Sequence, residues 1–108
     1  MNTPIFISGQ ISGLDKDVYT KRFNDAEDLL KSKGHIIVYN PIRVCSHLNE
    51  TINTWEDYME ACFAKLIRSK AIYMLNGWTK SRGARIEWSV ATVLDIEIIY
   101  QNPDDLPF

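Results

Sequence analysis

The chain has 108 residues, of which 45% are hydrophobic and 24% charged, so it is long enough for one domain with a buried core and too short for two. Its formal net charge of −2 gives no support for binding a nucleic-acid polymer, and no apolar run is long enough to span a membrane. The first residues do not resemble a signal peptide, so we expect one cytoplasmic domain over residues 1–108 that does not bind membranes.

The cysteine and histidine content gives no sign of a metal site. Cys45 and Cys62 lack metal-ligand spacing, and His35 and His47 are isolated from one another. We therefore expect no metal and no cofactor, and we interpret each cysteine as a buried or incidental thiol.

The N-terminal segment predicts a core strand followed by a polar loop. Residues 4–8 are mostly apolar, and Ser8, Gly9 and Gln10 begin the loop that leaves the strand. Serine hydroxyls and backbone amides beside glycine can hold a polar ligand, although a flexible connector has the same composition. The glycine spacing is not that of the dinucleotide-binding fingerprint or of the phosphate-binding P-loop.

The next segment predicts a helix and a second strand. Asp15 or Asp17 can cap a helix that runs to about residue 33, where Gly34 ends it. The apolar stripe of this helix consists of Tyr19, Phe23, Ala26 and Leu30. Residues 36–39 predict the second strand, which Asn40-Pro41 ends. Residues 42–53 have no clear period, and we interpret them as a loop over the site.

A second helix is predicted from residue 54 to about residue 68. Thr54 and, three residues later, Asp57 match a capping box. The buried stripe would be Tyr58, Cys62 and Leu66, with Met59 and Phe63 as further members. The apolar surface around Trp55, Met59 and Phe63 is our candidate for a contact with a second subunit.

Residues 77–87 contain the pattern around which the chain is organised. They follow the apolar run 71–75, which predicts a buried third strand, and Ser81 stands at the N-cap of a helix that extends to about residue 94. The free N–H groups and the positive dipole end of a helix start favour an anion, and Gly83 lets a ligand approach the first turn closely.

Glu87 lies one turn further along this helix. At helical spacing it shares the stripe that should pack on the sheet, whose members are Gly83, Glu87, Val90, Ala91 and Leu94. A carboxylate on an apolar face near a helix start is a candidate catalytic group. A glutamate at the border of the stripe would instead reach water and simply stabilise the helix.

The order of the elements predicts the fold. Residues 96–100 form a fourth strand, followed by a polar tail that contains proline. Because strands alternate with helices, we expect an α/β fold, a three-layer Rossmann-like or flavodoxin-like parallel sheet with strand order 2-1-3-4. Ligands bind such sheets in the crevice at the carboxyl ends of strands one and three. The loop that starts at Ser8 and the segment that contains Glu87 converge there.

These residues resemble those of a known superfamily. The run Ile7-Ser8-Gly9-Gln10-Ile11-Ser12-Gly13 and the pattern Gly77-Trp78-x-x-Ser81-x-Gly83-Ala84-x-x-Glu87 are similar to small phage and bacterial domains related to nucleoside 2-deoxyribosyltransferases. The similarity covers about residues 5–100. The Ser-x-Gly-x-x-x-Glu spacing also resembles that of the 2′-deoxynucleoside 5′-phosphate N-hydrolases. The resemblance implies that Glu87 is the nucleophile, that Ser81 with Gly83 binds the phosphate, and that the Ser8-Gly9 loop lines the nucleoside pocket.

Some positions differ from the pattern of these relatives. Phe6 stands where they often carry Tyr, and Gln10 stands where they usually carry Pro. Residues 76–80 lack the Asp with which the transferases handle the base. Glu56 or Asp57, at the start of the second helix, could take that role.

The resemblance implies cleavage or transfer at the N-glycosidic bond of a deoxynucleoside or its 5′-monophosphate. Trp78 and Trp88 are candidates for stacking on the base, with core packing as the alternative for both. Lys80 and Arg82 could meet a phosphate or serve as surface charges. Other classes are a nucleotide-sensing module without turnover and an interaction protein on the same scaffold. Relatives complete their sites from a neighbouring subunit, so we expect a homodimer or a larger homo-oligomer.

Overall fold

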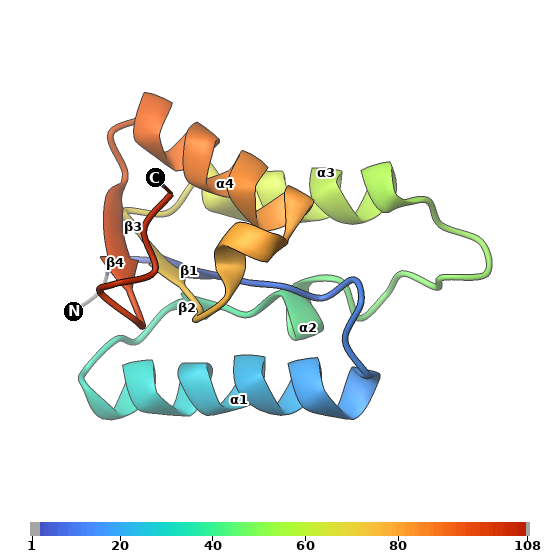
Figure 1. The fold of residues 1–108 in the computed structure, drawn as a ribbon, viewed down its shortest axis with the longest axis horizontal. Helices are drawn as coiled ribbons and strands as arrows, with labels where there is room; N and C mark the ends of the chain where they lie inside the picture. The colour runs from blue at the N-terminus through green and yellow to red at the C-terminus, as the bar shows by residue number, and fades with distance from the viewer. Residues whose placement is uncertain (1–2, 108) are drawn as a thin grey trace.

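Each strand of the described chain is separated from the next by one or two helices (Figure 1). The computed structural model describes residues 3–107. Its strands are β1 (Ile5–Ser8), β2 (Val38–Tyr39), β3 (Ala71–Met74) and β4 (Glu97–Tyr100). Its helices are α1 (Lys16–Ser32), α2 (Pro41–Val44), α3 (Trp55–Leu66) and α4 (Arg82–Val93), with the short 3-10 turn η1 (Trp78–Lys80). No helix within these residues is long and apolar enough to cross a membrane.

The strands form one parallel sheet in the order β2-β1-β3-β4, which confirms the predicted order. β1 pairs along its whole length with β3, from Ile5 opposite Ala71 to Ser8 opposite Met74. β2 is shorter than predicted and pairs with β1 over two residues. The preceding Ile36 lies outside β2, at this edge of the described sheet, and is 64% exposed.

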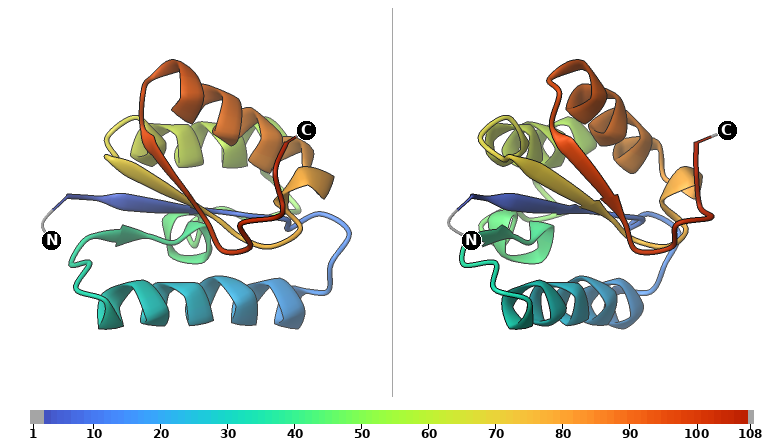
Figure 2. Two further views of the ribbon diagram at one scale, coloured as in Figure 1. Left: turned by 60° about the vertical axis from the view of Figure 1, so that its left-hand side comes forward. Right: turned by 90° about the vertical axis from the view of Figure 1, so that its left-hand side faces the viewer.

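Strand residues alternate between the two faces of the sheet, and each face has its own core. Ile5 and Ile7 of β1 pack with the apolar stripe of α1, whereas Phe6 between them packs with residues of α3 and α4. Both views of Figure 2 show the sheet between α1 on one side and α3 with α4 on the other. This arrangement confirms the predicted three-layer α/β class.

The helix ends follow the local signals in the sequence. Thr54 Oγ1 accepts the Asp57 N–H at 3.2 Å, and the Asp57 carboxylate accepts the Thr54 N–H at 2.9 Å, so the predicted capping box is present. Gly34 follows α1 with φ at 101°, the left-handed conformation that glycine adopts most easily. Asp15 is the N-cap of α1, but its side chain makes no capping hydrogen bond.

Asn40 and Pro41 end β2 as predicted, but they begin the short helix α2 rather than a loop. The Asn40 side chain accepts the backbone N–H two residues on at 3.0 Å, and Pro41 occupies the first helical position. The buried Glu27 of α1 holds this turn by accepting hydrogen bonds from Asn40 at 3.0 Å and from Arg43 at 2.8 Å. The chain then extends outward through residues 45–54 before α3 begins, at the right of Figure 1.

Candidate active site

Glu87 is buried in the second turn of α4, with 6% of its surface exposed. Ala84 and Ala91, on the same face of the helix, are 1% and 0% exposed. Glu87 therefore lies within the buried stripe, as its helical spacing predicts, and not at a solvated border. Leu94 departs from the predicted stripe and is 48% exposed, because α4 ends at Val93 and the chain turns there toward β4.

A hydrogen bond joins Glu87 to the end of β1. Ser8 Oγ donates to Glu87 Oε1 at 2.6 Å, and Ser8 is itself 0% exposed. Ser8 is the last residue of β1, and strand alternation turns its side chain to the face that Phe6 shares with α4. The parallel fold thus brings together two side chains that are 79 positions apart in the sequence.

Burial raises the pKa of Glu87 from 4.5 to about 7, because the charged form loses its hydration. The Ser8 hydrogen bond opposes this rise, since it stabilises the carboxylate, and the nearby Cys45 adds to it. Glu87 can therefore change its ionisation state near neutral pH, which is a property of catalytic carboxyl groups.

Glu27 is the second buried glutamate, and its environment has the opposite effect. Burial would raise its pKa, but hydrogen bonds from Lys31, Arg43 and Asn40 outweigh burial and hold the pKa at about 2. Glu27 is thus a structural group, ionised at neutral pH, that connects α1 to α2. The contrast shows that burial alone does not decide the pKa of a buried glutamate. The pKa of Glu87 is raised because its one side-chain donor, the neutral Ser8 hydroxyl, does not compensate for the lost hydration.

Glu87 lines a cavity of about 1060 Å³. The walls come from the loop after β1, the first half of α1, residues 41–53, the first half of α3 and the start of α4. Most of the predicted loop 42–53 therefore lines this cavity, although residues 42–44 belong to α2. This volume is slightly above the roughly 300–1,000 Å³ typical of small-molecule sites. The charged residues that line the cavity are Lys16, Glu50, Lys80, Arg82 and Glu87.

The start of α4 forms one side of this cavity. Ser81 Oγ accepts the Ala84 N–H at 3.2 Å, so Ser81 is the N-cap, as predicted. The Ser81 hydroxyl proton is not used in that bond, and the first N–H groups of a helix have no acceptor within it. Lys80 and Arg82 flank the cap, and the Arg82 guanidinium lies 4.5 Å from the ring centre of Trp55. This end of the cavity therefore has the donors and the positive charge that suit an anion.

At two glycines of the predicted site, a side chain would collide with a neighbour (Gly9) or meet it in a tight contact (Gly83). A Cβ atom on Gly9 would lie 2.8 Å from Leu75 Cδ1, and one on Gly83 would lie 3.1 Å from Met59 Sδ. Both glycines line the cavity. Close packing of the β1 loop on the end of β3, and of α3 on α4, accounts for both positions whether or not a ligand binds.

Trp78 does not line the cavity, although we considered it as a base-stacking residue. It is 1% exposed, its ring centre lies 5.8 Å from that of Trp88, and its indole N–H donates to the Asp105 carbonyl at 2.7 Å. Trp88 belongs to the same cluster and donates its N–H to the Tyr100 hydroxyl at 3.0 Å. Trp78 therefore has the packing role, because it has no free face for a base, and Trp88, which is partly buried, packs against it and does not line the cavity either.

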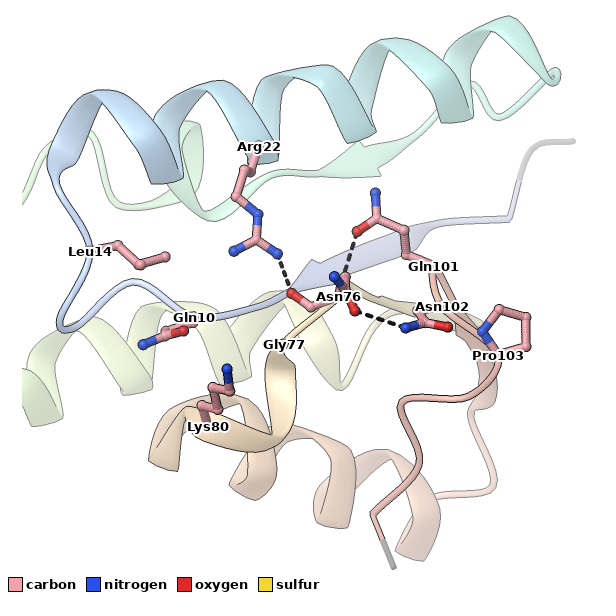
Figure 3. Close-up of a pocket in the computed structure, with 9 residues that line it drawn as sticks. All are labelled: Gln10, Leu14, Arg22, Asn76, Gly77, Lys80, Gln101, Asn102 and Pro103. Carbon is pink, nitrogen blue, oxygen red and sulfur yellow. Dashed lines mark hydrogen bonds between the residues drawn. The ribbon is translucent and has the colours of Figure 1, made fainter.

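Gln10 lies in a second hollow, of about 680 Å³, rather than beside Glu87 (Figure 3). Most polar groups of this hollow bind one another. The Asn76 N–H donates to Gln101 Oε1 at 2.8 Å, the Asn102 amide donates to Asn76 Oδ1 at 3.0 Å, and Arg22 donates to the Asn76 carbonyl. The first two bonds attach the C-terminal tail to the end of β3, and the third attaches α1 to it, so the hollow has a structural explanation. Gln10 takes no part in these bonds and donates to the Ser12 carbonyl at 3.1 Å.

The structure also identifies cavity residues that the sequence did not indicate. Glu50 is, with Glu87, one of two carboxyl residues that line the cavity within the described part of the chain. Asp57 is held in its capping box, and neither Asp57 nor Glu56 lines the cavity. Tyr58 does line it, from the same helix. No sequence signal marks Glu50, because it lies in a segment without periodicity. Within residues 3–107, no group of three or more His, Cys, Asp or Glu side chains is placed to hold a metal ion.

Comparison with known proteins identifies the family but not an activity. Comparisons with curated proteins and with solved structures gave no match. The sequence profile of a family described as "Domain of unknown function (DUF4406)" matches residues 3–100. This range is nearly the whole chain and includes Ser8, Ser81 and Glu87. The chain therefore belongs to the DUF4406 family.

Proposed function

We propose that the protein cleaves the N-glycosidic bond of a deoxynucleoside or its 5′-monophosphate, or transfers the sugar to another base, with Glu87 as the nucleophile. The observation that carries the proposal is a buried carboxyl group in the wall of a large cavity, 2.6 Å from the Ser8 hydroxyl. Its place at the carboxyl edge of a parallel sheet is where such folds bind ligands. The reaction class comes from the resemblance to the nucleoside 2-deoxyribosyltransferase superfamily.

In the proposed reaction, a carboxylate oxygen of Glu87 bonds to the sugar carbon C1′ as the C1′–N bond breaks. The electron pair of the broken bond leaves with the base, which takes up a proton. The carboxylate stabilises the oxocarbenium-like transition state through its negative charge. Attack of water on the resulting ester releases the sugar and regenerates Glu87, whereas attack by a second base completes a transfer.

The environment of Glu87 suits this role. With a pKa of about 7, a substantial fraction of the group is ionised at neutral pH, and the poorly hydrated carboxylate is a better nucleophile than a solvated one. Ser8 fixes one carboxylate oxygen by its 2.6 Å hydrogen bond. The other oxygen then has a defined direction, which is what in-line attack on a bound sugar requires.

Glu50 is our candidate for the group that protonates the departing base. It lines the same cavity as Glu87 and belongs to the 45–54 segment that connects α2 to α3. Burial and, after it, the charge of Glu50 raise the pKa values of Tyr19 and Tyr58, so the Glu50 carboxyl group is close to two cavity-lining hydroxyl groups. Replacing Glu50 by glutamine should therefore slow base release while leaving nucleotide binding intact.

A 5′-phosphate would bind at the start of α4 in this proposal. The Ser81 hydroxyl and the first helical N–H groups supply hydrogen-bond donors, and Lys80 and Arg82 supply charge. Lys16 adds a third basic residue to the cavity lining, against the carboxyl groups of Glu50 and Glu87. This balance favours a phosphorylated substrate over a neutral one.

The test is to incubate the protein with a panel of deoxynucleosides and their 5′-monophosphates and to measure free base by chromatography. We expect base release by the wild type and a loss of several orders of magnitude in Glu87→Gln, which keeps the shape and removes the charge. Glu27→Gln is the matched control, because it also removes a buried glutamate charge but lies outside the cavity lining. Equal turnover by the wild type and Glu87→Gln would remove the catalytic proposal.

A melting experiment with the same panel separates the alternatives. A nucleotide that raises the melting temperature without any base release would replace the enzyme with a nucleotide-sensing module. No response in either assay would favour an interaction protein on this scaffold.

A further inference from the structure

Two thiols lie within reach of each other in the wall of the cavity. The sulfur atoms of Cys45 and Cys62 are 3.8 Å apart, and these are the only two cysteines of the chain. Cys45 is the C-cap of α2 and is half-buried, whereas Cys62 is on the buried face of α3 with 7% of its surface exposed. Both residues line the cavity that contains Glu87.

We propose that Cys45 and Cys62 form a site of reversible oxidation, at which a hydroperoxide converts the two thiols into an intramolecular disulfide. The sulfur atoms of a disulfide lie about 2 Å apart, so the 3.8 Å gap must close by less than about 2 Å, shared between two side chains. The inference rests on the placement of the thiols and is independent of any catalytic role of Glu87.

The surroundings assign different roles to the two thiols. Cys45 is the more exposed, so a small peroxide in the cavity reaches it first. The hydrogen bond between the two sulfurs lowers the pKa of Cys45 and raises that of Cys62, and burial raises the latter further. Cys45 is thus the more easily ionised thiol, and the thiolate is the form that reacts with peroxides.

The reaction balances with the peroxide as oxidant. The Cys45 thiolate attacks one peroxide oxygen, the O–O bond breaks, and Cys45 becomes a sulfenic acid while the other oxygen leaves as water or an alcohol after protonation. The Cys62 sulfur then attacks the Cys45 sulfur, the S–O bond breaks, and the hydroxyl leaves as water with the Cys62 proton. Two thiols lose two electrons in total, and the peroxide gains them.

The disulfide would attach the start of the 45–54 segment to helix α3. The bond closes a loop over the residues between the two cysteines, from 46 to 61, which include Glu50 and the start of α3. Residues 45–54 otherwise connect α2 to α3 through turns, without regular secondary structure (Figure 1). Oxidation would therefore restrict a segment that contributes five polar residues to the cavity lining: Ser46, Asn49, Glu50, Thr51 and Asn53.

The test treats the full chain with hydrogen peroxide, then unfolds and alkylates it and maps its peptides without reduction. We expect a cross-linked peptide that joins Cys45 to Cys62 within one chain, its reversal by a dithiol reductant, and a rise in melting temperature on the order of 10 °C. Free thiols at both positions after treatment, or disulfides only between chains, would overturn the proposal.

Single variants test the order of the two steps without needing the disulfide to form. In Cys62→Ser, Cys45 should accumulate as a sulfenic acid that a dimedone reagent traps. In Cys45→Ser, the buried Cys62 should react at least tenfold more slowly. Equal trapping at both positions would contradict the assignment of Cys45 as the reacting thiol, and melting curves confirm that each variant is folded.

Discussion

Replacing Glu87 by glutamine should make the protein more stable at neutral and alkaline pH. The folded protein holds Glu87 with a pKa of about 7, against 4.5 in the unfolded chain. The folded state therefore binds a proton more tightly than the unfolded state between these values, and its stability falls as pH rises through this window. Glutamine has no charge to desolvate, so the variant should not lose this stability.

The magnitude follows from the two pKa values. A rise from 4.5 to about 7 corresponds to roughly 3 kcal/mol, because each tenfold change in proton affinity is worth about 1.4 kcal/mol. Below pH 4.5 the wild type and Glu87→Gln should be nearly equal, since glutamine still offers Ser8 an acceptor oxygen. Above about pH 8 the variant should be more stable by about 2–3 kcal/mol.

The assay is denaturant unfolding of both proteins from pH 4 to pH 9. Glu27→Gln is the matched control with the opposite sign, because the pKa of Glu27 is held at about 2. The stability that Glu27 contributes is present above pH 4.5 and is lost as pH falls toward 2. Its replacement should therefore destabilise the protein at neutral pH, by about 1–2 kcal/mol given the exposure of its partners Lys31 and Arg43.

A constant difference between the wild type and Glu87→Gln across the whole pH range would refute the reasoning. It would mean that Glu87 is hydrated in solution and keeps an ordinary pKa. A difference that grows with pH would instead identify Glu87 as a group that lowers the stability of the fold, as functional residues often do.

Three further predictions follow from the same geometry. Ser8→Ala should move the rise of kcat/KM with pH, centred near 7 in the wild type, to higher pH, because the Glu87 carboxylate loses a stabilising hydrogen bond; an unchanged pH profile would contradict this role. Ser81→Ala should weaken 5′-monophosphate binding by about 1–2 kcal/mol in calorimetry and spare unphosphorylated nucleosides, with melting measured alongside because a lost cap costs up to about 1 kcal/mol. Light scattering at micromolar concentration should show a homodimer or larger assembly, and a monomer would count against it.

The fold was predictable because its signals are local and periodic. Alternating strands and helices require a parallel sheet, and the rules for crossovers leave few strand orders. The burial of Glu87 followed from its helical spacing, and the N-cap role of Ser81 followed from its position before an apolar stripe. Both predictions use only residues within ten positions of the residue concerned.

The rest of the site depends on contacts between distant segments. The bond from Ser8 to Glu87 requires the strand direction and the placement of α4 on that face of the sheet, over 79 positions. The meeting of Cys45 and Cys62 requires the path of a segment that has no period. Trp78 follows a glycine turn beside the site, where a core indole and a ligand-stacking indole have the same sequence signature.

The most direct test of the central claim is a search for the sugar ester on Glu87. The wild type is mixed with the deoxynucleoside 5′-monophosphate that it turns over fastest and is quenched in acid during turnover, and its peptides are analysed by mass spectrometry. The nucleophile proposal predicts an ester that joins the Glu87 side chain to C1′ of 2-deoxyribose 5-phosphate, and no such ester in Glu87→Gln. A sugar ester on a different residue, or base release by Glu87→Gln at the wild-type rate, would contradict it.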